Sequence, residues 1–129
     1  TCSIDKTAMT LEELSAFVAA CVARFDPAPG EWLYAELWEF ERGNQPGKKF
    51  RTIRAALDAA APRNPVLLEG TDGHHFAVNS LALATAKNAG GEIVGLSAAT
   101  LKSDFADLAQ YVGVDAAGEP NGKLTETYI

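Results

Sequence analysis

The sequence predicts an α/β fold, because segments with helical and strand periodicity alternate along one chain of 129 residues. Apolar residues recur every three or four positions at residues 11–25 and again at 53–60, as on one face of a helix. Four aromatic residues within residues 31–40 share one parity, as they would on one face of a strand. A short apolar run at residues 66–69 indicates a buried strand after the second helix.

The first helix is expected at residues 11–25, where Thr10 and Glu13 have the spacing of a capping box. It should end before the Asp-Pro-Ala-Pro-Gly sequence of residues 26–30, which is typical of a turn. The strand at residues 31–40 follows. We expect its aromatic residues to lie in the core rather than to form a stacking platform; they are Trp32, Tyr34, Trp38 and Phe40.

The later elements follow from the same patterns. The sequence predicts helices at residues 52–61, 77–89 and 97–112, short extended segments at 66–69 and 92–96, and a final strand at 123–129. This amounts to about four helices and three to four short strands in a single α/β segment. The chain starts without methionine and ends on a strand with an open edge, so we expect it to be cut from a longer protein.

Composition excludes several functional classes. The chain carries 17 acidic and 11 basic residues, a net charge of −6, and its basic residues are scattered, so we expect no nucleic-acid partner. No apolar run reaches the roughly 20 residues that a membrane span needs, and the N-terminus lacks the pattern of a signal peptide. We therefore expect no membrane association.

The two cysteines suggest a reducing environment. Cys21 falls on the apolar face of the first helix, where a free cysteine acts as a small hydrophobic residue. Cys2 lies in a terminus that we expect to be mobile, and a disulfide between the two is the less favoured alternative. The predicted localisation is therefore cytoplasmic.

The only two histidines, His74 and His75, follow a polar turn, Thr71-Asp72-Gly73, that ends the apolar run. Adjacent side chains point in different directions, so the two imidazoles are poor joint ligands for one metal ion. They could cap the turn and face solvent. Alternatively, one histidine could face a cleft, with Asp72 or Thr71 orienting its ring and the N–H groups of the turn meeting an anion.

A set of short motifs then occurs in a fixed order over about residues 10–129: Gly30-Glu31-Trp32-Leu33, Leu57-Asp58, Pro62-Arg63-Asn64-Pro65-Val66, Asp72-Gly73-His74, Asn79-Ser80-Leu81-Ala82-Leu83 and Gly118-Glu119-Pro120-Asn121-Gly122-Lys123-Leu124-Thr125-Glu126. In this order they resemble the amidohydrolase family 3 proteins, the YtcJ-like metal-dependent hydrolases. The stretch between Gly91 and Asp115 departs from the spacer usual in that family.

The resemblance implies a fragment of a (β/α)8-barrel amidohydrolase that includes part of its insertion. Such a barrel takes about 250 residues, so this chain has about half the necessary length. The family hydrolyses amide-like C–N bonds with a divalent metal, which we expect to be zinc. Its His-x-His metal motif is absent here, so we expect this chain alone to be catalytically inert and to bind no zinc tightly.

The resemblance also implies roles for individual residues. His74 would be the catalytic histidine and contact the substrate, Asp72 would bind the substrate, and Glu126 would belong to the metal site. His75 falls at a variable position. The partner would be a small-molecule substrate of the larger enzyme, and the isolated segment could self-associate. The alternative is a stand-alone α/β module that binds a protein or a small ligand without catalysis.

Overall fold

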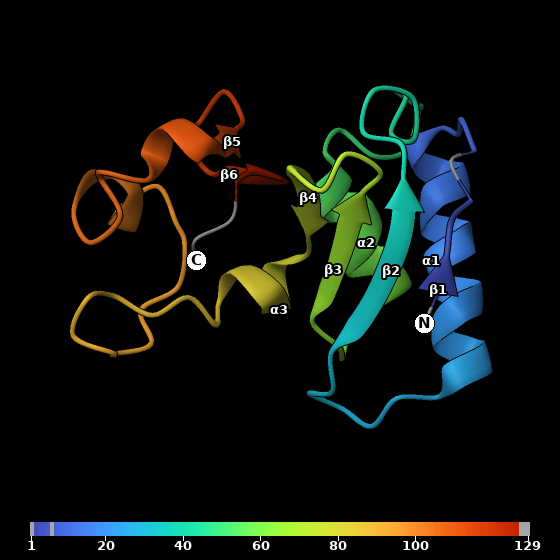
Figure 1. Ribbon diagram of the computed structural model, residues 1–129, viewed down its shortest axis with the longest axis horizontal. Coiled ribbons are helices and arrows are strands. Elements are labelled where there is room, and N and C mark those ends of the chain that lie inside the picture. Colours follow the sequence, from blue (N-terminus) through green and yellow to red (C-terminus); the bar gives the residue numbers. More distant parts are fainter. Residues whose placement is uncertain (1, 6, 127–129) are drawn as a thin grey trace.

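The computed structural model describes residues 2–5 and 7–126, which form a six-stranded mixed sheet with helices (Figure 1). In chain order the strands are β1 Cys2–Ser3, β2 Leu33–Trp38, β3 Val66–Gly70, β4 His75–Val78, β5 Val112–Val114 and β6 Pro120–Thr125. The α-helices are α1 Leu11–Phe25, α2 Ile53–Ala60 and α3 Ser80–Leu83, and two 3-10 helices are η1 Thr100–Lys102 and η2 Ala109–Tyr111. The predicted α/β class is confirmed.

The sheet has a parallel half and an antiparallel half. Its strand order is β1-β2-β3-β4-β6-β5, with β1, β2 and β3 parallel and the remaining neighbours antiparallel. The described residues thus contain more strands and fewer α-helices than the sequence predicts. Only the first three strands follow the parallel arrangement that defines a (β/α)8 barrel.

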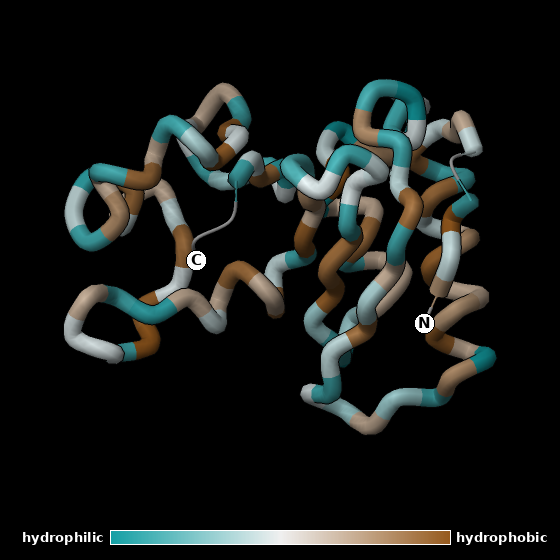
Figure 2. Tube along the Cα trace, in the orientation of Figure 1, coloured by the Kyte–Doolittle hydropathy of each residue, from teal (hydrophilic) through white to brown (hydrophobic). Residues whose placement is uncertain are grey.

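Two hydrophobic cores lie on opposite faces of this sheet. Successive strand residues point to opposite faces of the sheet and therefore into different cores. Leu68 and Ala77 belong to the core under α1 and α2. Val78 belongs to the other core, and Leu67 packs against that core. That second core is completed by α3 and by residues 84–111, here called the outer segment (Figure 1). Figure 2 shows hydrophobic stretches both in the central strands and in this segment.

The α1 helix forms as predicted. The Thr10 hydroxyl accepts the Glu13 N–H at 3.2 Å, and the Glu13 carboxylate accepts the Thr10 N–H at 3.0 Å, which completes the capping box. The helix ends at Phe25, where Asp26 adopts a left-handed conformation. Within the described ranges, none of the helices has the length and apolar character needed to cross a bilayer.

The prediction of a helix at residues 77–89 is wrong. Ala77 and Val78 instead end β4, paired with β3, and Asn79 caps the single turn of α3. The chain then turns back, because the side chain of Asn88 accepts the N–H groups of Gly90 and Glu92. Of the extended segment expected at residues 92–96, only an isolated bridge between Lys87 and Ile93 forms.

The helix expected at residues 97–112 is replaced by turns and the two 3-10 helices. Hydroxyl groups compete for the backbone here: Thr100 donates to the Gly95 carbonyl, and Ser103 donates to the Ala99 carbonyl. Leu101 and Phe105 still reach the second core, so their spacing reflects burial rather than a helix. Of the final strand expected at residues 123–129, β6 contains 123–125, and residues 127–129 lie outside the described residues.

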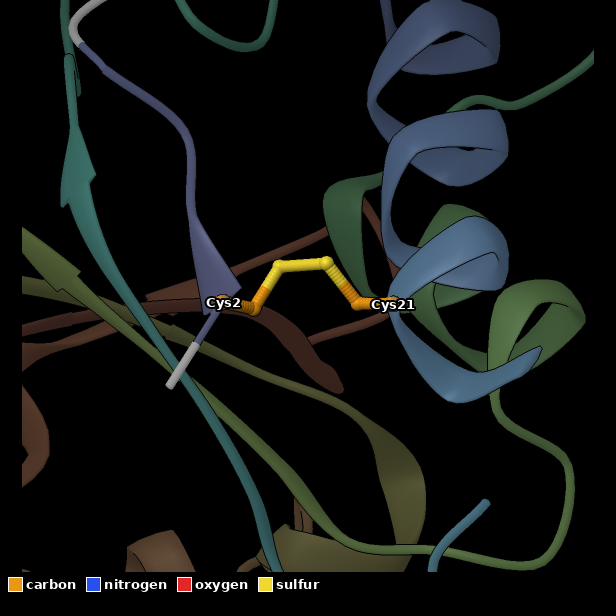
Figure 3. Close-up of a disulfide and its surroundings, with 2 residues drawn as sticks. All are labelled: Cys2 and Cys21. Atoms are coloured by element: carbon orange, nitrogen blue, oxygen red, sulfur yellow. A yellow bond between two sulfur atoms is a disulfide. The ribbon is translucent and has the colours of Figure 1, made fainter. Parts of the chain in front are cut away.

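The two cysteines form a disulfide, contrary to the expectation of free thiols (Figure 3). The parallel pairing of β1 with β2 places Cys2 beneath α1, where Cys21 faces the sheet, and their Cα atoms are 6.0 Å apart. Cys2 is buried in β1, which is an edge strand of the sheet, so the expectation of a mobile terminus at this residue is wrong. The expectation of a cytoplasmic location rested on free thiols, and that premise does not hold.

Removing this disulfide should destabilise the fold. The bond closes a loop with a sequence separation of 19, so its loss should lower the free energy of unfolding by about 3 kcal/mol. Urea unfolding of the Cys2→Ala/Cys21→Ala variant, and of the unchanged protein with and without reductant, measures the effect. Two titratable thiols in the native protein without reductant, or a stability insensitive to reductant, would contradict the assignment.

Candidate functional site

The candidate site lies at the turn between β3 and β4. The N–H of Thr71 donates to the carbonyl of Trp38 at 2.9 Å, which ties the turn to the end of β2. Gly73 has a φ of 73°, a left-handed backbone conformation that residues other than glycine rarely adopt. Its N–H donates to the Gly70 carbonyl at 3.1 Å. The turn is therefore held by its own backbone before any histidine contributes.

Asp72 is the organising side chain of the turn. Its Oδ1 accepts the N–H groups of His74 at 2.9 Å and His75 at 3.1 Å. One hypothesis from the sequence was that the N–H groups of this turn bind an external anion. In the structure an internal carboxylate already occupies them, so that part of the hypothesis is wrong.

His75 is held at one edge and on one face of its ring. Its Nδ1 lies 2.6 Å from Asp72 Oδ2, and its ring stacks on Phe40 with a centroid distance of 3.6 Å and an interplanar angle of 3°. Its side chain is 33% exposed. The aspartate therefore orients the ring of His75 rather than that of His74, and these contacts indicate a bracing role for His75.

His74 pairs instead with Glu126, its Nδ1 lying 2.5 Å from Glu126 Oε1. The antiparallel pairing of His75 with Thr125 in β4 and β6 brings these two flanking residues opposite each other. The N–H of Glu126 also donates to the carbonyl of His74 at 2.8 Å. The His74 side chain is 63% exposed, so its imidazole remains accessible from solvent.

The two pairs share one chemical feature. In each, the Nδ1 atom faces a carboxylate, so a neutral ring carries its proton on Nδ1 and has its lone pair on Nε2. A carboxylate that orients an imidazole in this way makes Nε2 the atom that accepts a proton or coordinates a metal ion. Of the two rings, that of His74 is the accessible one.

A zinc site needs more donors than the pair of His74 and Glu126 supplies. His74 and Glu126 are donor types that zinc accepts, but a catalytic zinc site uses three protein ligands. Among the described residues, no group of three or more His, Cys, Asp and Glu residues is placed to hold a metal ion. Asp72, the third predicted site residue, is engaged with His75.

A second polar cluster, at the end of the β3–β4 hairpin opposite the histidine turn, was missed by sequence reasoning. Asp58 accepts the N–H of Ser80 at 2.7 Å and the Ser80 hydroxyl at 2.5 Å, and Arg54 Nε donates to the same hydroxyl at 2.7 Å. The spacing of Arg54 and Asp58 on one face of α2 is the signal that could have indicated it. The cluster explains why a Leu-Asp pair and an Asn-Ser pair occur together, since Asp58 holds the start of α3.

The predicted aromatic core is only partly correct. Trp38 is buried, but Trp32 is 38% and Tyr34 54% exposed, and their rings stack with centroids 5.9 Å apart. A cavity of about 440 Å³ lies beside Trp32, and its apolar lining includes Leu67, Val78, Leu83, Leu96 and Leu124. This is the feature that the alternative, a small-ligand-binding module, would use.

Comparisons with known proteins add no family assignment. No protein-family model, no curated protein and no solved structure matches this chain.

Protonation of Asp72 should weaken the turn. The N–H of His74, followed by the contacts of His75, lowers the pKa of Asp72 below its usual range, although partial desolvation opposes this. Because the pKa is lowered in the folded state, the ionised group stabilises the fold above the unfolded pKa of about 3.9, and this stabilisation is lost as the pH falls through the folded value.

We therefore expect the stability difference between the unchanged protein and Asp72→Asn to be largest above about pH 5 and to shrink below about pH 4. Urea unfolding across this range measures the difference, and a carbon-13 titration of the carboxyl group locates its pKa. Asp107→Asn, which removes another exposed carboxylate, controls for net charge. A difference that stays constant from about pH 3 to about pH 6 would refute the role of the ionised group.

Proposed function

We propose that this chain is part of a metal-dependent amidohydrolase that acts on amide-like C–N bonds and is inert as an isolated segment. The observation that supports the proposal is the contact between His74 and Glu126. These two residues belong to different motifs of the resemblance and are far apart in the sequence. A shared site gives a reason for both motifs to occur in one chain.

In this proposal each residue has a distinct task. Glu126 holds the proton on Nδ1 of His74 and so directs the Nε2 lone pair toward a substrate. Asp72 fixes the backbone that follows Gly73, so that the position of His74 does not depend on substrate. His75 braces the turn through Phe40 and needs no contact with the substrate.

The metal belongs to the complete enzyme in this proposal. A bound zinc ion would supply an activated water for attack on the carbonyl. Glu126 Oε1 is engaged by His74, and no group of three or more His, Cys, Asp and Glu donors is found among the described residues. We therefore derive no step through the metal for this chain, and the remaining ligands would come from other parts of the proposed enzyme.

The test has two arms. In calorimetry the 129-residue chain should show no stoichiometric zinc binding at micromolar affinity. In the complete polypeptide containing this chain, loaded with zinc and assayed on N-acyl amides, His74→Asn and Glu126→Gln should each lower kcat/KM by about 100-fold or more. The matched control is His75→Phe, which removes a histidine but can keep the stacking on Phe40, and it should retain activity within a few-fold.

Two results would contradict the proposal. One is amide turnover by the 129-residue chain that EDTA abolishes, because it would show that the chain needs no further ligands. The other is a complete polypeptide in which the His74 and His75 variants behave alike.

A further inference from the structure

A second cavity, of about 340 Å³, lies at the start of α2, on the side of the sheet opposite the outer segment. The loop that follows β2, the first turn of α2 and the β6 strand all contribute to its walls. This cavity uses none of the residues of the histidine site. The inference below is therefore independent of the proposed function.

The charged residues that line this cavity are all basic: Lys48, Arg51 and Lys123. Within the described part of the chain, the two ion pairs both involve histidines, so none of these three cations has a carboxylate partner. Such a local excess of positive charge is notable in a chain with a net charge of −6. An unpaired basic cluster around a concavity raises the local concentration of anions.

A close backbone approach assembles the cluster from distant segments. Gly122 in β6 has a φ of 101°, and an added Cβ there would lie 2.8 Å from the backbone nitrogen of Arg54 in α2. Only glycine allows β6 to approach the first turn of α2 so closely. This contact brings Asn121 and Lys123, on either side of Gly122, to the same cavity as Thr52.

The cavity also contains a side chain with an unmet hydrogen bond. Asn44 lines it, and its Nδ2 is buried without a hydrogen-bond partner, the one such side-chain atom found among the described residues. A buried donor that lacks a partner costs about 1–3 kcal/mol. The Nδ2 atom has almost no accessible surface, so a ligand oxygen could accept its hydrogen bond only after the Asn44 side chain rotates toward the cavity.

The acidic residue Glu12 lies beside the loop that lines the cavity and is not itself part of the lining. The carboxylate of Glu12 accepts the N–H of Lys49 at 2.5 Å and lies against Gly47, where an added Cβ would collide with it. The N–H groups of this loop, that of Lys49 foremost, lower the pKa of Glu12. Glu12 therefore neutralises part of the local charge, and the three lining cations still outnumber it.

We propose that this cavity binds a small phosphate monoester. A phosphate group carries a charge of about −1.5 to −2 at neutral pH and several acceptor oxygens, which suit two lysines and one arginine. The arginine can meet two phosphate oxygens at once. Leu11, Phe50 and Ile53 provide apolar surface for the organic part of the ligand.

Binding of phenyl phosphate to the 129-residue chain tests the site, followed by calorimetry and by amide chemical shifts. We expect saturable binding with a Kd on the order of 1 mM or tighter that weakens with salt. Arg51→Gln and Lys123→Gln should each weaken it by about tenfold or more. The matched control is Lys102→Gln, an exposed lysine in η1 outside the cavity, which should bind as the unchanged protein does.

Inorganic phosphate and benzoate separate the contributions of the two halves of the ligand. Inorganic phosphate should bind the same residues more weakly, since it lacks the apolar part. Benzoate binding as tight as that of phenyl phosphate would overturn the assignment to phosphate, as would equal binding by the Arg51 and Lys102 variants or no saturable binding. Unfolding curves of each variant distinguish loss of binding from loss of fold.

Discussion

The side chain of Asn79 connects more of the backbone than any other polar group described above. It is fully buried, and its Oδ1 accepts the N–H of Val66 at 2.9 Å and of Ala82 at 3.0 Å. Its Nδ2 donates to the carbonyl of Asn64 at 2.7 Å and of Ala61 at 3.3 Å. One amide thus joins the end of α2, the start of β3 and the start of α3, which immediately follows β4.

This amide also sets the register of the hairpin that carries the histidines. Val66 opens β3 and Asn79 follows β4, so the bond between them fixes the open end of the pair, and Leu67 lies opposite Val78. A slip by one residue would exchange the residues that face the two cores. The same strand β4 also pairs with β6, and that pairing places His74 opposite Glu126.

The sequence predicts those parts of the fold that local chemistry determines. The α1 helix follows from its capping box and apolar period, and β3 follows from its short apolar run. The disulfide was not predicted, because it depends on pairing between β1 and β2, a contact between distant segments. Residues 97–112 have apolar residues at helical spacing, yet hydroxyl-to-backbone bonds and burial in the second core favour turns there.

The contacts within the candidate site could not be predicted from the sequence. The resemblance named Asp72, His74 and Glu126, whereas the stacking of His75 on Phe40 depends on where β2 ends relative to the turn. No local sequence pattern indicates where the end of β2 lies relative to the turn between β3 and β4. The basic cavity is hidden for the same reason, since Arg51 and Lys123 are distant in sequence and meet only through the approach of β6 to α2.

The most direct measurement for this account is the effect of Asn79→Ala on both stability and the histidine site. Loss of the amide leaves several buried backbone groups without partners, so the free energy of unfolding should fall by about 3 kcal/mol or more. The ring signals of His74 and His75 should shift together, whereas Asn88→Ala, in an exposed turn, should leave both histidines unchanged. A loss within about 0.5 kcal/mol with unaltered histidine signals would contradict the claim that this buried amide positions the site.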